Sequence, residues 1–164
     1  SLTSSNSATL SRTGQATVNN KGENNATLTI NSGSSITATS HNTVQGKDQD
    51  GLTVTNSGTI SSGGSKAINL LNAQNSSVTN NSSGIIKSDT NTITLTENSG
   101  TGNNVTINNS GQIFAEAVSS GTTNNNAVKS DDDTNNMSLT NNVGGHIYNN
   151  NSSATALHKP TVII

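Results

Sequence analysis

Apolar and polar residues alternate in short runs along the chain. The clearest runs lie at 27–30, 52–55, 92–96 and 105–107, where aliphatic side chains fill every second position and threonine fills most of the others. A period of two residues predicts β-strands, because successive side chains of a strand point to opposite faces. A helix would need a 3.6-residue apolar period and good helix formers, whereas threonine, serine, asparagine and glycine dominate here. The pattern therefore predicts an all-β protein whose strands bury one aliphatic face.

A longer repeat is built from these runs. An apolar strand, an Asn-Ser-Gly turn or a variant of it, and a second strand recur about six times, and four of the glycines have isoleucine two residues later. The spacing between successive glycines is shortest at the start, from Gly14 to Gly33, and longest at the end, from Gly111 to Gly145. Periods of roughly 20 to 50 residues are typical of solenoids. The glycines that mark the repeat are Gly14, Gly33, Gly58, Gly84, Gly111 and Gly145.

A third short strand is expected in most repeats, after a polar loop, at 43–44, 67–68, 92–93, 127–128 and 156–157. Three strands per repeat make a triangular coil, and parallel crossovers are overwhelmingly right-handed. The expected fold class is therefore all-β, a right-handed parallel β-helix (β-solenoid) of about six coils with three short strands per coil. We expect residues 1–164 to form a single β-helix fragment of a longer surface protein, with no internal domain boundary.

The turns between the first two strands are expected to stack from coil to coil. Glycine suits a backbone with positive φ, asparagine tolerates the same region, and stacked asparagine amides can bond to one another along the rod. The residues expected in this turn ladder are Asn31, Gly33, Asn56, Gly58, Asn81, Gly84, Asn109, Gly111, Asn142 and Gly145. The isoleucines expected to point into the core are Ile36, Ile60, Ile86, Ile113 and Ile147.

Composition narrows the kind of core that can form. The 164 residues include 29 asparagines, no tryptophan, no cysteine and one each of Phe, Tyr and Met. A core without large aromatic side chains has to be narrow and aliphatic, and it cannot be held by disulfides. Leu, Ile, Val and Phe number 31, a low fraction that is typical of disordered chains, but the net charge of −2 is too small to match that class.

The phrases at 52–60 and 105–113 resemble the passenger domains of bacterial autotransporters, and the likeness covers most of the chain. The resemblance implies a β-helix secreted through an outer-membrane barrel, found on the bacterial cell surface either anchored to the outer membrane or released. It further implies cell adhesion, virulence and biofilm formation. The implied partners are a host cell-surface or matrix molecule, or another copy of the chain, with membrane attachment only through a C-terminal barrel that this sequence does not contain.

Acidic residues follow the expected third strand in three coils. Several oxygen ligands brought to one edge could hold calcium weakly or form an acidic docking strip, although solvated loops explain the same residues. The candidate binding residues are Asp48, Asp50, Glu97, Asp131, Asp132 and Asp133. Apart from this possible calcium we expect no cofactor and no metal, because His41, His146 and His158 lie at unrelated offsets.

Catalysis and nucleic-acid binding find little support. There is no cysteine, no Gly-X-Ser-X-Gly elbow and no base matched to a serine or threonine. A carbohydrate-active β-helix would need paired carboxylates or a basic cluster beside aromatic platforms, and aromatic residues are almost missing. A sequence pI near 5.8 gives no basic footprint for nucleic acid. We therefore expect a chain that is not an enzyme.

Thr-X-Thr pairs at 27–29, 53–55 and 92–96 are also typical of ice-binding solenoids, in which threonine repeats in register over many coils. The repeats at Val78 and Leu139 keep only Thr79 and Thr140, so we expect the array to be interrupted. The favoured function is a cell-surface adhesin segment that mediates attachment to host surfaces or self-association through its polar faces. The alternatives are a passive stalk or spacer, a carbohydrate-active β-helix enzyme and an ice-binding solenoid.

Overall fold

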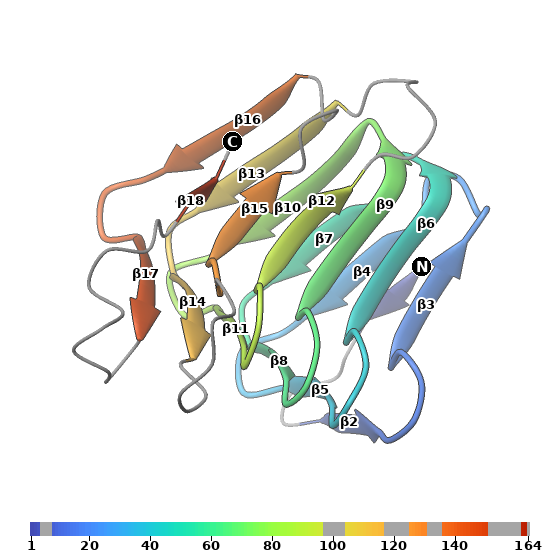
Figure 1. Cartoon of the computed structure of the whole chain (residues 1–164), viewed down its shortest axis with the longest axis horizontal. Coiled ribbons are helices and arrows are strands. Elements are labelled where there is room, and N and C mark those ends of the chain that lie inside the picture. The colour runs from blue at the N-terminus through green and yellow to red at the C-terminus, as the bar shows by residue number, and fades with distance from the viewer. Residues whose placement is uncertain (4–7, 97–103, 117–124, 131–135, 151–161, 164) are drawn as a thin grey trace.

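The computed structural model describes residues 1–3, 8–96, 104–116, 125–130, 136–150 and 162–163. The chain passes through three parallel sheets in turn, and no helix occurs in these ranges (Figure 1). Each sheet contains six strands, one from each of six successive coils. The predicted all-β solenoid with three strands per coil is therefore confirmed.

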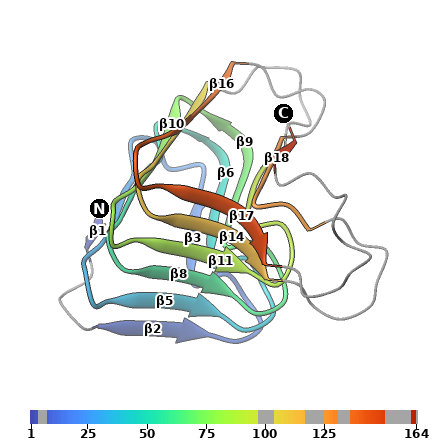
Figure 2. The ribbon, with the colours of Figure 1, turned by 90° about the vertical axis from the view of Figure 1, so that its left-hand side faces the viewer.

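The strands follow one another in the order sheet A, sheet B, sheet C. Sheet A consists of β1 (Leu2–Thr3), β4 (Thr27–Ile30), β7 (Thr53–Asn56), β10 (Ser76–Asn80), β13 (Val105–Asn109) and β16 (Met137–Asn141). Sheet B consists of β2 (Thr9–Arg12), β5 (Ser35–Ala38), β8 (Thr59–Ser62), β11 (Ile85–Ser88), β14 (Gln112–Glu116) and β17 (His146–Asn150), stacked one above another in Figure 2. Sheet C consists of β3 (Val18–Lys21), β6 (Val44–Asp50), β9 (Ile68–Gln74), β12 (Ile93–Thr96), β15 (Val128–Ser130) and β18 (Val162–Ile163).

The strand register gives a more regular repeat than the glycine spacing predicted. Leu10 pairs with Ile36, Ile36 with Ile60, and the column continues through Ile86, Ile113 and Ile147. Successive members are spaced almost evenly from Leu10 to Ile113, and a longer segment separates Ile113 from Ile147. The short first step predicted between Gly14 and Gly33 is wrong, because Gly14 lies after β2, whereas the later marker glycines precede a sheet B strand.

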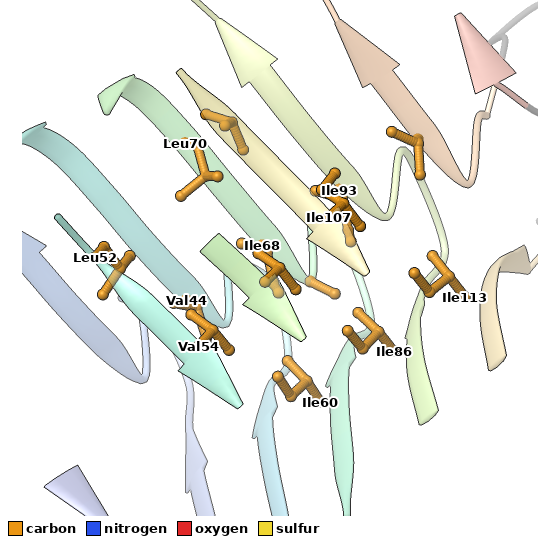
Figure 3. Packing of buried hydrophobic residues seen from close by; sticks show 14 of the residues in the cluster. Val44, Leu52, Val54, Ile60, Ile68, Leu70, Ile86, Ile93, Ile107 and Ile113 are labelled. Atoms are coloured by element: carbon orange, nitrogen blue, oxygen red, sulfur yellow. The ribbon is translucent and has the colours of Figure 1, made fainter. Parts of the chain in front are cut away.

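One aliphatic column from each sheet meets the others in a narrow core (Figure 3). Val54, Ile60 and Ile68 of the third coil are fully buried, as are the equivalent side chains Val78, Ile86 and Ile93 of the fourth coil. Ile107 and Ile113 continue the columns with no exposed surface, Ile36 is buried, and Ile147 packs half-buried against the core. Full burial of such a side chain is worth about 1.5 to 3 kcal/mol. The repeated columns replace the wide core that this composition cannot supply.

Threonine joins the sheets at the corner between sheets B and C. Thr17 Oγ1 donates to the carbonyl of Thr37 at 2.8 Å, and Thr92 Oγ1 donates to the carbonyl of Phe114 at 2.7 Å. Each bond runs from one coil to the next, and Thr43 makes the equivalent bond to Ser61. These threonine hydroxyls therefore connect successive coils at this corner.

Two predictions about sheet C are corrected. β6 and β9 have seven residues each and are not short, because a residue with positive φ, Asp48 (51°) or Asn72 (50°), bends each strand without ending it. In the last coil the strand that pairs with β15 is β18, at Val162–Ile163. The strand predicted at 156–157 lies outside the described residues.

Candidate functional site

The outward side of sheet A carries two registered rows of hydroxyl side chains, which we call the hydroxyl face. The rows form because the strands turn mostly aliphatic side chains inward, with a terminal asparagine in β7, β10 and β13, and most of the positions between them are threonine or serine. The first row is Thr27, Thr53, Ser77, Thr106 and Ser138. The second row is Thr3, Thr29, Thr55, Thr79, Asn108 and Thr140.

The threonine array is interrupted as expected, because serine replaces threonine in the first row of the coils that contain Val78 and Leu139, but the row of hydroxyls continues. Ser77 and Ser138 occupy the first row where threonine was missing from the sequence pattern, so a hydroxyl is present there in every one of five coils. Asn108 is the one residue of the two rows without a hydroxyl. The run at 92–96 does not contribute, because β12 belongs to sheet C.

The hydroxyl face is regular, accessible and uncharged. Neighbouring strands of a sheet lie about 4.8 Å apart, and alternate residues of one strand are roughly 6.6 Å apart, so the two rows form a nearly rectangular grid. Every residue in the rows is half-buried or exposed, and none carries a charge. The sheet thus presents a fixed array of hydrogen-bonding groups.

The outward side of sheet B begins in the same way and then changes. Thr9, Ser35 and Thr59 pair in one row, but the row continues with Ile85, Gln112 and His146. The second row continues from Ser11, Thr37 and Ser61 to Lys87, Phe114 and Tyr148. Of sheets A and B, sheet A therefore carries threonine or serine in its rows in all of its described coils, whereas the rows of sheet B lose them after the third coil.

The later part of sheet B gathers the aromatic and charged residues of neighbouring coils. The rings of Phe114 and Tyr148 stack with centroids 4.9 Å apart and an interplanar angle of 12°. Lys87 Nζ lies 3.0 Å from Glu116 Oε1. Partial burial raises the pKa of the Asp89 carboxyl above its ordinary value of 3.8, and the Glu116 charge raises it further, while Lys87 acts in the opposite direction. A hydrogen bond between the two carboxyl side chains adds to the rise.

Sequence reasoning missed this cluster because it counted aromatic residues without aligning them. Phe114 and Tyr148 each follow a marker glycine, Gly111 or Gly145, by three residues, so the repeat itself places them side by side. Phe114 itself offers little surface to a sugar, because it is only 8% exposed and Tyr148 stacks on its ring. The stack packs two neighbouring coils together on the outer side of sheet B.

The asparagine ladder exists and includes Asn56 and Asn109 as predicted, but its other members are Asn80 and Asn141. Asn56 Nδ2 donates to Asn80 Oδ1, Asn80 Nδ2 to Asn109 Oδ1, and Asn109 Nδ2 to Asn141 Oδ1, each at 2.8 Å. Asn56, Asn80 and Asn109 have no exposed surface. These buried amides lie inside the rod, where each one links two coils.

Three asparagines assigned to the ladder lie elsewhere. Ile30 pairs with Asn56, so Asn31 is one residue too late to belong to the column. Asn81 and Asn142 are displaced in the same way and form an outer row, in which their Nδ2 atoms donate to Ser57 Oγ at 2.8 Å and Ser110 Oγ at 3.0 Å. The error arose because the length of the turn differs between coils, which shifts the asparagine relative to the glycine.

The marker glycines are needed mostly for space, not for positive φ. Gly33 has a φ of 79°, as expected, but Gly58, Gly84, Gly111 and Gly145 are not among the residues with positive φ. A Cβ on Gly58 would lie 2.3 Å from the carbonyl oxygen of Ser34 in the preceding coil. The backbones of successive coils approach so closely at this turn that a side chain does not fit.

The predicted acidic strip is not assembled by the described residues. Asp48 and Asp50 lie in β6, not in a loop, and accept hydrogen bonds from Asn72 Nδ2 at 2.7 Å and Asn75 Nδ2 at 2.8 Å of the next coil. Glu97, Asp131, Asp132 and Asp133 lie outside the described residues. Within the ranges that the structure describes, no three His, Cys, Asp or Glu side chains are grouped to hold a metal ion.

Comparisons of the chain with protein families, curated proteins and solved structures find no match. The described residues also contain no helix of the length and hydropathy required to cross a membrane.

Proposed function

We propose that this chain is a non-enzymatic adhesive segment of a bacterial surface protein and that the hydroxyl face makes the adhesive contact. The observation that supports this proposal is the two-row array of uncharged, accessible hydroxyls across five coils of sheet A. A regular polar surface of this kind makes many weak polar contacts. Weak contacts become effective when many copies on one cell engage together.

The bacterial location rests on the Asn-Ser-Gly phrases at 52–60 and 105–113, which resemble autotransporter passenger domains. The partner is a host cell-surface or matrix molecule, or a second copy of the chain. The absence of charge on the hydroxyl face favours a neutral partner, because a charged one would lose hydration without gaining an opposite charge. Such a surface also allows two copies to approach without repulsion.

A pair of lysine substitutions in one coil tests the proposal. Thr55 and Thr59 are both half-buried threonines of the third coil, but Thr55 lies in the hydroxyl face and Thr59 lies on sheet B. Beads coated with the full chain would be counted on host-cell monolayers, and clumping of the coated beads would be followed in parallel. We expect Thr55→Lys to reduce attachment or clumping strongly and Thr59→Lys to leave both unchanged.

Equal behaviour of the two variants would contradict the assignment of the contact to sheet A. Wild-type beads that neither attach to cells nor clump would contradict the adhesive function itself. Circular dichroism and the melting temperature of each variant establish that both are folded.

A further inference from the structure

We infer that the ligand best matched by the hydroxyl face is a periodic one, the surface of an ice lattice. This inference rests on the proposed function in one respect, because it takes the hydroxyl face to be the surface that makes the contact. It goes further by stating what kind of surface the face is built to meet.

The grid repeats in two directions, and that is what a lattice requires. The first row carries a hydroxyl in five consecutive coils and the second row in five of six, with roughly 4.8 Å between coils and 6.6 Å between rows. Oxygen atoms on an ice surface repeat at spacings of this order. A single flexible glycan or peptide needs no such regularity, so a lattice explains the whole array where a small ligand would explain only a part of it.

The array is held rigid before any ligand arrives. Apart from Ser77, Asn108 and Ser138, the positions of the two rows are threonine, which is β-branched and has few side-chain rotamers, so its hydroxyl and methyl groups stay near fixed positions. The buried ladder from Asn56 to Asn141 lies at the ends of the same strands and fixes their register by three hydrogen bonds of 2.8 Å. Little conformational entropy is therefore lost when the face meets an ordered surface.

The chemistry of the face also suits water in an ordered state. Threonine offers a hydroxyl that bonds to a lattice oxygen and a methyl group that does not compete for it. A charged side chain would hold its own hydration shell, and the two rows contain none. Sheet C, by contrast, carries Lys47 and Lys129 among its outward residues, and the sheet B rows are broken by Lys87.

The test measures how much of the full chain is taken up by slowly growing polycrystalline ice, compared with an inert soluble protein that ice excludes. We expect the wild-type chain to be enriched in the ice fraction and to slow ice recrystallisation. Thr55→Lys should lose most of this enrichment, whereas Thr59→Lys should keep it. Asn108→Thr, which would complete the second row, should increase it.

Exclusion of the folded wild-type chain from ice would overturn the inference, and so would equal loss in the two lysine variants. Binding to powdered crystalline cellulose or chitin without enrichment in ice would also overturn it, in favour of a solid polysaccharide. Failure here is distinguishable from failure of the proposed function. If Thr55→Lys abolishes attachment to cells while ice excludes the wild type, adhesion through sheet A stands and the lattice ligand is wrong.

Discussion

At the scale of single residues, the buried asparagines of the ladder are constrained by the hydrogen bonds that they make inside the rod. A buried amide destabilises the fold unless its donors and acceptor have partners. Asn80 has all of them, because its Oδ1 accepts from Asn56, while its Nδ2 donates to Asn109 and to the carbonyls of Gly84 and Gln112. The ladder thus fixes the register of adjacent coils as well as filling the rod.

Asn80→Ala should lower the free energy of unfolding by about 1 to 3 kcal/mol, since it leaves the amide of Asn56 and the side-chain oxygen of Asn109 without their partners in the ladder. Urea unfolding followed by circular dichroism measures the change. Asn81→Ala is the matched control, because Asn81 lies in the outer row and its side chain bonds to Ser57. Equal losses in the two variants would show that the inner ladder has no special weight.

Asp89 should make stability depend on pH in the direction opposite to that of most carboxylates. Its pKa is raised by partial burial and by Glu116, so the folded state holds the proton after the unfolded state has released it. Stability due to this group is therefore unaffected below pH 3.8 and falls as the pH rises from 3.8 through the raised folded pKa.

Asp89→Asn should remove this fall, so the variant gains melting temperature relative to wild type at neutral pH and matches it near pH 3. Thermal unfolding of both proteins across this pH range provides the measurement. If the difference in melting temperature between them stays constant with pH, the assignment to Asp89 is wrong.

At the scale of the elements, the turn between sheets A and B decides how closely the coils stack. A Cβ added to Gly111 would lie 2.3 Å from the carbonyl oxygen of Gly84 and 2.4 Å from that of Asn81. Both atoms belong to the backbone of the preceding coil, so no side-chain rotation can relieve the clash. The close approach of these backbones explains why glycine recurs at this position in four coils.

Gly111→Ala should lower the free energy of unfolding by about 1 to 3 kcal/mol, because the added methyl group overpacks an ordered interior. Gly144→Asn serves as the control, because Gly144 has a φ of 84°, which asparagine tolerates, and open space where its Cβ would lie. Chemical denaturation of both variants decides between them. A variant Gly111→Ala as stable as Gly144→Asn would show that the turn can move apart freely.

At the scale of the whole molecule, the stack of nearly equal coils can be shortened without disturbing its register. Thr53 pairs with Ser77. Deletion of residues 53–76 therefore joins Leu52 directly to Ser77, which takes the position that Thr53 occupied. The shortened protein should fold with the same circular dichroism spectrum and a rod about 4.8 Å shorter. It also loses one coil of the hydroxyl face.

This deletion separates an adhesive segment from a passive spacer. An adhesive face that depends on many weak contacts should lose part of its attachment when Thr53 and Thr55 are removed with their coil. A passive spacer binds nothing itself, so beads coated with it should attach to cells no better before the deletion than after it. Bead attachment that does not fall in the folded deletion variant would favour the spacer.

Local sequence determined which residues form strands and which side of each strand is buried. The alternation around Val54 and the isoleucine two residues after each of Gly58, Gly84 and Gly111 were sufficient for this. Side chains alternate across a strand whichever strands lie beside it. The tertiary structure alone decided which residues of different coils meet. The turns vary in length, so Asn80 and not Asn81 joins Asn56 in the ladder, and Ser77 completes the hydroxyl face. Register between coils is set by hydrogen bonds between strands that lie a whole coil apart in the sequence, and no local pattern contains that information.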